Sequence, residues 1–292
     1  MKATYTWFIP LLSLIFMSTI FIFMQNTLVM EESAVDLELL LNSTFDPSHK
    51  RYQNYSTLEE YAQVTGDVKA ASIAECIREL AVRWRDVRTS DPPPDEVIEL
   101  SGEKILVWGC RGKFIYLDAY TTVRSEAEAS AYISRRIKLL KYLASAYPDH
   151  VLDAVVSPIK PLTLEDYAKL IRDGINVTWT KYQLVKLKTG EYVGGGVFSF
   201  PTSIEDHIKR HHGNVSGLSI QILDFKVKAS ISKLMKLQEN PLVLLVDVGP
   251  LDVVYKYVKE GAMVYIKRPF GGYLTEQIIA YGLTINKESI HQ

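Results

Sequence analysis

The sequence first restricts its own function through what it lacks. Only two cysteines occur among 292 residues, too few for a four-cysteine zinc site. The phosphate-loop motif G-x-x-x-x-G-K-[ST], the dinucleotide motif G-x-G-x-x-G and the nucleophile motif G-x-S-x-G are all missing. In the classes that carry them, these motifs hold phosphate groups or a catalytic nucleophile. Their absence argues against those classes. We therefore expect no cofactor, and the sequence assigns no catalytic residue.

An excess of charge of one sign is missing as well. The formal net charge is −1, and 23% of the residues are charged. A general nucleic-acid binder needs a basic surface to neutralise phosphates, so we expect no nucleic-acid partner. The 11% of aromatic residues, which include 17 tyrosines, are instead typical of a chain that folds around a core.

The clearest positive feature is the uncharged apolar run WFIPLLSLIFMSTIFIFM over residues 7–24. A helix of this length spans about 27 Å, close to the thickness of the hydrocarbon core of a bilayer. A cleaved signal peptide has a shorter apolar core followed by small residues, whereas QNTLVMEES follows here. We expect an uncleaved transmembrane helix; a cleaved signal and a buried helix are the alternatives.

The residues that flank this run predict its orientation. Lys2 and the terminal amine precede it, and acidic residues follow it at positions 31, 32, 36 and 38. Positive charge favours the cytosolic side of a membrane. We therefore expect a single-pass cell-membrane protein with a cytosolic N-terminus and an extracytosolic remainder.

The asparagines favour the same location. Four of the seven stand in the glycosylation pattern N-x-S/T, namely Asn42, Asn54, Asn176 and Asn214. Ordinary serine and threonine abundance would give about one such pattern by chance. Acceptor asparagines are modified on extracytosolic surfaces, so the pattern predicts a glycoprotein; coincidence in a polar surface is the alternative.

Prolines, glycines and apolar spacing divide the chain into five segments. They are a cytosolic N-terminus (1–6), the transmembrane helix (7–24), a juxtamembrane linker (25–56), a part with a helix, a three-stranded meander and a second helix (57–149), and an α+β part (150–292). The expected fold class is α+β, with an N-terminal transmembrane helix and an extracytosolic domain that contains an antiparallel meander and two β-α-β units.

The segment 57–149 starts with helical spacing that is interrupted at Gly66 and resumes to about residue 88. Its apolar stripe is expected to pack in the core and consists of Ile73, Cys76, Ile77, Leu80, Ala81 and Trp84. Three short β-type runs over 97–120 follow, separated by glycine-containing turns that indicate antiparallel hairpins.

Ser125 begins the pattern S-E-A-E, which predicts a capped helix that ends near residue 146. Its basic residues alternate with apolar ones. We expect these basic residues to form the solvated face of the helix: Arg135, Arg136, Lys138 and Lys141.

The segment 150–292 contains two similar successions of elements. A strand, a helix and a second strand are predicted over 151–185 and again over 242–267, and each helix has a Pro-Leu near its start and a glycine at its end. We read each succession as a β-α-β unit. Between them we expect a strand at 191–200 and short helices near 203–212 and 229–238.

The cysteines leave two alternatives open. Outside the cell, Cys76 and Cys110 would form one disulfide; otherwise they are two buried thiols. Cys110 also stands between basic residues in W-G-C-R-G-K, where positive charge lowers a thiol pKa. A catalytic role is disfavoured because the only upstream histidine, His49, lies in the expected linker.

Three further clusters have a functional and a plain structural interpretation. His207 and His211 would share one face of a helix and are weak candidates for metal ligands, with Glu205, Asp206 and His212 nearby. The glycine triplet 194–196 is better explained by a bent or bulged strand than by an anion site. The basic turn at 267–272 is better explained as a loop.

We therefore expect an anchored extracytosolic domain that binds a ligand or a protein or cell-surface partner, and the membrane itself through residues 7–24. One alternative is an anchored hydrolase that uses the two histidines or the carboxylates of Asp153, Asp247 and Asp252. The other is a structural subunit of a cell-surface or secretion assembly. Dispersed catalytic residues leave no local motif, so the sequence alone does not decide between them.

Overall fold

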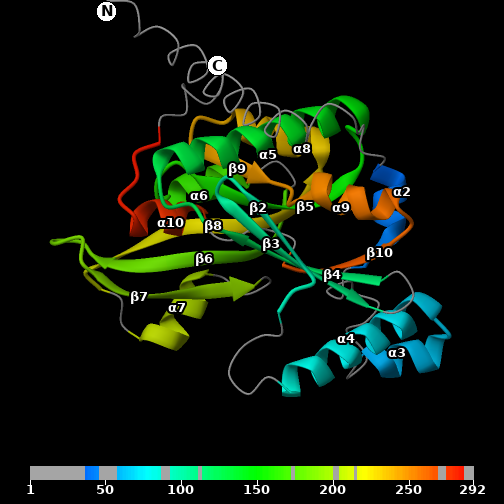
Figure 1. The fold of residues 1–292 in the computed structure, drawn as a ribbon. Helices are drawn as coiled ribbons and strands as arrows, with labels where there is room; N and C mark the ends of the chain where they lie inside the picture. The colour runs from blue at the N-terminus through cyan, green and yellow to red at the C-terminus, as the bar shows by residue number, and fades with distance from the viewer. Residues whose placement is uncertain are drawn as a thin grey trace, which may run out of the picture. The chain divides into compact units, whose positions relative to one another are not determined.

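The computed structural model describes residues 37–45, 58–86, 93–110, 114–171, 175–199, 204–213, 216–268 and 274–285. These residues form a mixed α+β fold with two five-stranded sheets (Figure 1). Sheet A has the strand order β1 (Thr44–Phe45), β10 (Met263–Arg268), β4 (Phe114–Thr121), β3 (Glu103–Cys110) and β2 (Glu96–Leu100). Sheet B has the order β7 (Tyr192–Ser199), β6 (Asn176–Lys186), β8 (Leu218–Ser230), β5 (Val151–Pro158) and β9 (Val243–Asp247).

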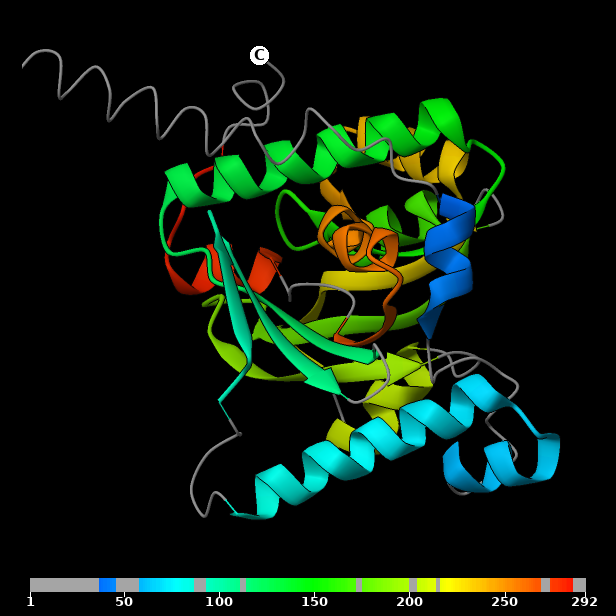
Figure 2. The ribbon, with the colours of Figure 1, turned by 45° about the vertical axis from the view of Figure 1, so that its right-hand side comes forward.

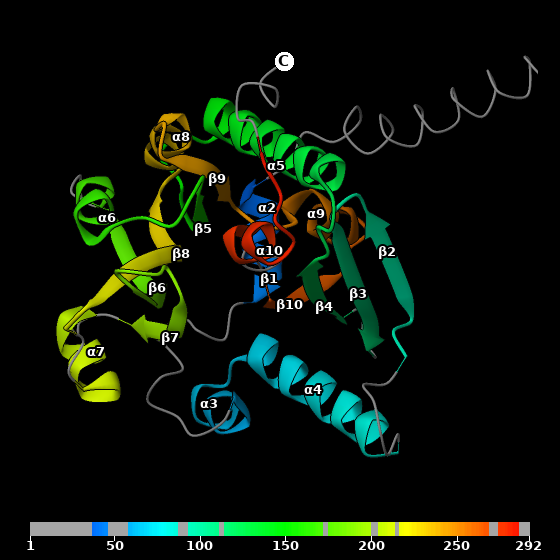
Figure 3. The ribbon, with the colours of Figure 1, turned by 90° about the vertical axis from the view of Figure 1, so that its left-hand side faces the viewer.

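Nine helices are described around these strands. They are α2 (Leu37–Ser43), α3 (Leu58–Thr65), α4 (Val68–Asp86), α5 (Glu126–Ala146), α6 (Leu164–Leu170), α7 (Ile204–His212), α8 (Ile231–Glu239), α9 (Leu251–Lys259) and α10 (Leu274–Ala280). Figure 3 shows α9 and α10 between the two sheets and α5 running across them.

The meander predicted over 97–120 is confirmed, because β2 pairs antiparallel with β3 and β3 pairs antiparallel with β4. The first turn requires glycine at position 102. Gly102 has a φ of +73°, and a Cβ there would lie 2.9 Å from the carbonyl oxygen of Glu128. The turn therefore also fixes how closely the hairpin approaches the start of α5.

The predicted helices α3 and α4 form beside sheet A (Figure 2). Ile73, Cys76 and Leu80 are buried, and the last two pack in one cluster with Trp108 and Tyr116 of the meander. Ile77 is different, since 36% of it is exposed. The stripe is thus confirmed for Ile73, Cys76 and Leu80 and wrong for Ile77. The side chains of Ala81 and Trp84 lie outside the described residues.

Sheet B is antiparallel throughout and is centred on β8, a strand absent from our predictions. This strand separates β5 from β6. The first expected β-α-β unit therefore has its two strands parallel but not adjacent. Helices α6 and α7 cover one face of sheet B and α10 covers part of the other (Figure 3).

The second expected β-α-β unit is wrong as a unit. Its first strand, β9, belongs to sheet B, and its second, β10, pairs with β4 in sheet A. Helix α9 therefore connects two sheets instead of crossing over one. For the same reason position 150 does not divide the fold, and residues 37–292 form one compact unit.

Part of the expected linker 25–56 is folded. Helix α2 has the sequence LELLLNS; Leu37 is fully buried and only 1% of Leu40 is exposed. The next two residues, β1, pair in parallel with β10. Burial of the two leucines ties α2 to the domain, so this part of the expected linker belongs to the compact unit.

No helix among the described residues is long and apolar enough to cross a bilayer. The apolar run 7–24 lies outside those residues. The transmembrane helix and its orientation therefore stay predictions.

One side chain of the expected solvated face of α5 is fully buried, which corrects that prediction. Arg136 has no exposed area. Its guanidinium contacts the carboxylate of Glu103 on β3, lies 3.3 Å from Asp247 on β9 and 3.5 Å from Asp252 on α9. Burial alone disfavours the charged guanidinium, but Glu103 and Asp247 outweigh it and raise the pKa of Arg136. Arg136 thus joins both sheets through one ion network.

The remaining basic residues of α5 differ among themselves. The Arg135 guanidinium lies 2.7 Å from the Glu103 carboxylate, and only 13% of the Arg135 side chain is exposed. Lys138 and Lys141 are exposed, as predicted. Because Arg136 is sequestered by carboxylates from distant segments, helical spacing alone could not separate it from its solvated neighbours.

Candidate functional site

An open groove of about 380 Å³ lies between the β6–β7 hairpin and α10. We call it the α10 groove. Its lining residues come from four elements and are Lys181, Tyr182, Gln183, Tyr192, Gly195, Gly196, Val197, Leu223, Glu276, Ile279 and Ala280. Three of these are exposed apolar or aromatic side chains: Tyr192 (64%), Val197 (46%) and Ile279 (46%).

Strand alternation divides β6 between the groove and the opposite face of the sheet. Lys181 and Gln183 line the groove, whereas Thr180 is fully buried on the other side. There the Tyr167 hydroxyl of α6 lies 2.7 Å from the Thr180 hydroxyl, and the Tyr182 hydroxyl lies 3.1 Å from Nε2 of His212 in α7. The helices on the far face therefore hold the groove floor in place.

The glycine triplet makes this part of the floor flat. A Cβ at Gly195 would lie only 2.6 Å from the carbonyl oxygen of Tyr182, so no other residue fits without moving the strand. The register shifts at Val193, next to the triplet, so the predicted bulged strand is confirmed. Gly195 serves close packing of β7 on β6, and it leaves the groove side free of a side chain.

The polar groups of the groove are paired with one another. The Lys181 ammonium contacts the Glu276 carboxylate, which comes from the first turn of α10. The Gln183 amide nitrogen donates to the Gln221 amide oxygen at 2.7 Å, and these residues are directly opposite in the β6–β8 register. The groove thus offers apolar surface and amide groups, with its one cation and its one anion already compensated.

A buried carboxylate lies beside the groove. Asp224 is directly opposite Lys181 and has no exposed area. Its Oδ1 accepts from the Ser157 hydroxyl at 2.6 Å and from the Thr275 backbone N–H of α10 at 3.4 Å. Burial raises the pKa of Asp224 to about 6, although these hydrogen bonds and Lys181 act in the other direction. Asp224 therefore ties the start of α10 to the sheet.

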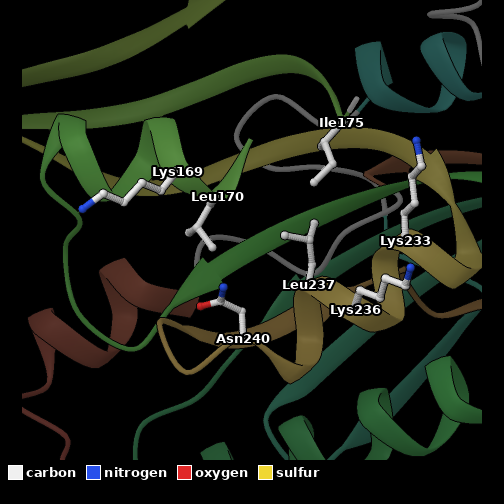
Figure 4. A pocket seen from close by; sticks show the side chains of 7 residues that line it. All are labelled: Lys169, Leu170, Ile175, Lys233, Lys236, Leu237 and Asn240. Carbon is white, nitrogen blue, oxygen red and sulfur yellow. The ribbon is translucent and has the colours of Figure 1, made fainter. Parts of the chain in front are cut away.

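A second, smaller hollow of about 130 Å³ lies between α6 and α8 (Figure 4). Leu170, Ile175 and Leu237 form its apolar part, and Lys169, Lys233 and Lys236 surround it. Figure 4 shows the three ammonium groups pointing in different directions. They do not converge on one ligand position, so we prefer the α10 groove as the candidate site.

The carboxylates named for a hydrolase do not form one accessible site. Asp247 and Asp252 both contact Arg136, but they are sequestered in its ion network, and Asp247 is 3% exposed. Asp153 lies on β5, with its carboxylate 3.7 Å from the Lys226 ammonium. Asp247 and Asp252 therefore stabilise the fold through their contacts with Arg136.

The two histidine candidates are neighbours on α7, with ring centroids 4.4 Å apart. Desolvation, His211 and Arg210 lower the pKa of His207. The described residues contain no group of three ligands that could hold a metal ion. His212 instead bonds to Tyr182, and the Glu205 side chain lies outside the described residues.

Cys76 and Cys110 form a disulfide, with Cα atoms 5.4 Å apart, that ties α4 to β3. This geometry corresponds to the first of the two alternatives and leaves no free thiol for a catalytic role of Cys110. The side chains of residues 111–113 and of the whole basic turn 267–272 are not described.

Of the acceptor asparagines, Asn176 is the one whose side chain is described, and it is exposed at the start of β6. Asn42 lies in α2, but its side chain is not described; Asn54 and Asn214 fall outside the described residues. The exposure of Asn176 is compatible with modification, which stays a prediction.

Sequence reasoning did not find the α10 groove. Its residues come from segments near 181, 195, 223 and 279, so no local motif joins them. One usable signal was the alternation of LSIQILDFKVKAS over 218–230, which predicts the missing central strand. Comparison with protein-family models, with curated proteins and with solved structures finds no match to this chain.

Proposed function

We propose that this protein is a single-pass membrane protein whose extracytosolic α+β domain binds a ligand or partner in the α10 groove. The observation that best supports this proposal is the open groove itself, which has a volume of about 380 Å³. Val197 is exposed on its floor and Ile279 on its wall. Concave, largely apolar sites with a few fixed polar groups are typical of ligand binding.

The pairing of the polar groups indicates the class of ligand. Lys181 and Glu276 neutralise each other, so a ligand of strong net charge would have to break their ion pair. A neutral, mainly apolar group that also uses amide hydrogen bonds fits better, such as an uncharged peptide segment or a neutral small molecule. Gln183 is placed to provide such bonds.

Two further observations support the proposed compartment. The disulfide between Cys76 and Cys110 suits an oxidising environment outside the cytosol. The exposed Asn176 offers a glycosylation acceptor on the surface of the folded unit. Both agree with a cytosolic N-terminus and an anchor over residues 7–24.

Photo-crosslinking in intact membranes tests the groove. A benzophenone amino acid replaces Ile279 on the groove wall, and in a matched control it replaces Val151, which is 52% exposed and lies away from the groove. We expect a discrete adduct from position 279 alone. The adduct should decrease strongly when Val197→Glu places a charge on the apolar floor of the groove. An adduct insensitive to Val197→Glu, or identical at position 151, contradicts groove binding.

Glycosidase treatment of the chain from its native membranes tests the compartment separately. We expect increased electrophoretic mobility, with a smaller change in the Asn176→Gln variant. Unchanged mobility together with protease protection of the C-terminal part would overturn the proposed orientation, whatever the groove binds.

A further inference from the structure

The ends of the two sheets differ in how they are protected against pairing with another strand. An exposed edge strand is a template for a further strand, and proteins block it with charge, short length or a covering element. Four such ends exist in the described part of the chain: β1 and β2 in sheet A, and β7 and β9 in sheet B.

Three of these ends are protected. β1 has only two residues. β2 carries Glu96 and Glu99, and Glu96 accepts a hydrogen bond from the Tyr257 hydroxyl at 2.7 Å. β9 is wholly buried, and the Gln238 side chain of α8 both donates to the Leu244 carbonyl and accepts from the Val246 N–H. Each end therefore has a specific obstacle to strand addition.

Among the described residues, the fourth end, β7, lacks these obstacles along most of its length. Its eight residues, YVGGGVFS, carry no charge and no proline. Val193 and Val197 are 48% and 46% exposed. A bulge at Val193 disturbs only the N-terminal part of this strand, and Gly194–Ser199 pairs with β6 without interruption. This strand is thus a long and uncharged edge with two exposed valines.

The sequence of β7 matches itself when two copies run antiparallel. Residues 193–197 read V-G-G-G-V, which is symmetric about Gly195. A two-fold axis at Gly195 would place Val193 opposite Val197 of a second copy and glycine opposite glycine. No like charges meet, and valines opposite each other are favourable cross-strand pairs. A closed dimer needs such a self-complementary patch.

A foreign peptide is a less suitable occupant of this edge. Strand addition obtains sequence specificity from pockets for alternate side chains, and the glycine triplet provides none. The α10 groove does not supply them either, because its lining comes from β6, β7, β8 and α10 and thus lies inward of the outer edge of β7.

We propose that β7 pairs antiparallel with β7 of a second copy of this chain, about a two-fold axis near Gly195, and joins two sheets B into one continuous sheet. The symmetry places the same face of both sheets on one side, so the two α10 grooves open in the same direction. This inference does not depend on ligand binding in the groove.

The molecular mass of the full chain in detergent provides the first test. By analytical ultracentrifugation we expect a dimer for the unaltered chain. The double variant Val193→Lys/Val197→Lys places like charges opposite each other, and should raise the dissociation constant by at least about tenfold. The matched control Val97→Lys changes a valine that is 43% exposed on the protected strand β2, and should remain dimeric.

Cross-linking in native membranes provides the second test and decides the matter if the lysine variant fails to fold. Chains with Val193→Cys and chains with Val197→Cys are produced together and treated with a short bismaleimide. We expect a dimer-sized product that contains both variants, and none from Val97→Cys. A monomeric unaltered chain, a dimer that persists in the folded lysine variant, or no mixed product would overturn the proposal.

Discussion

The guanidinium of Arg136 donates to the carbonyl oxygen of Gly249 at 2.7 Å, so the middle of α5 is bonded to the turn that precedes α9. The N–H of Gly249 in turn donates to the Asp247 carboxylate at 2.8 Å, which also faces Arg136. The backbone leaving sheet B is therefore fixed from both sides. Arg136 thus connects α5 both to Glu103 of sheet A and to the turn that leaves sheet B.

Replacement of Arg136 by methionine should destabilise the domain severely. The change leaves the carboxylates of Glu103, Asp247 and Asp252 in a dry site without their shared cation. Loss of one partner from a buried ion cluster costs about 3–5 kcal/mol. Urea unfolding at neutral pH measures the loss. The control Lys141→Met, on the exposed side of α5, should stay within about 0.5 kcal/mol of the unaltered protein; equal losses would contradict a special role for Arg136.

The same helix shows how far the sequence could lead. Its bounds, 126–146, follow from local signals, and the Ser125 hydroxyl accepts from the Glu128 N–H as the capping pattern predicts. The burial of Arg136 does not follow, because its partners lie at positions 103, 247 and 252. Local periodicity reports a helix, whereas a buried charge is revealed only by its distant partners.

The sheets show a second limit. The meander follows from its glycine turns, because each turn joins neighbouring strands. The order of sheet B does not, because β5 pairs with β8 and β9, which lie far along the chain. The α10 groove depends on that order, since Lys181 and Asp224 meet only where β6 pairs with β8. Because β8 was not predicted from the sequence, the α10 groove could not be predicted either.

The disulfide between Cys76 and Cys110 should contribute measurably to stability. It closes a loop with a sequence separation of 34, and loop closure on this scale is worth about 4 kcal/mol in the chain-entropy description. We expect dithiothreitol to lower the melting temperature of the unaltered protein. The Cys76→Ala/Cys110→Ala variant should melt lower and be insensitive to the reductant; an unaltered protein equally insensitive would show that no such bond is present.

Gly195 and Gly194 should respond differently to alanine. In Gly195→Ala the new Cβ meets the Tyr182 carbonyl oxygen at 2.6 Å, a backbone atom that cannot move without shifting β6. We expect a loss of about 1–3 kcal/mol, typical of overpacking. In Gly194→Ala the nearest atom is the His212 ring at 3.4 Å, so the loss should be within about 0.5 kcal/mol. Thermal unfolding of both variants checks this; a similar loss in both would contradict the close approach of β7 to β6.

The buried carboxylate of Asp224 predicts a pH dependence with a definite sign. Its pKa is raised from 3.8 to about 6 in the folded protein. Between about pH 4 and pH 6 the folded state therefore holds a proton that the unfolded state releases, and a rise in pH destabilises the protein. This pKa shift of about two units corresponds to about 3 kcal/mol of folding stability. The stability is lost as pH rises through 6, and at higher pH Asp224 causes no further change.

Urea unfolding of Asp224→Asn at pH 4 and pH 7 measures this contribution. The amide replaces Oδ2, which lacks a hydrogen-bond partner among the described residues, so the variant should be less stable than the unaltered protein at pH 4. The difference should shrink by about 3 kcal/mol at pH 7, because only the unaltered protein carries the buried charge there. Ser157→Ala removes a hydrogen bond to the charged form and should extend the loss of stability to higher pH. Parallel pH profiles for the unaltered protein and Asp224→Asn would show that the carboxylate titrates normally and does not hold α10 in this way.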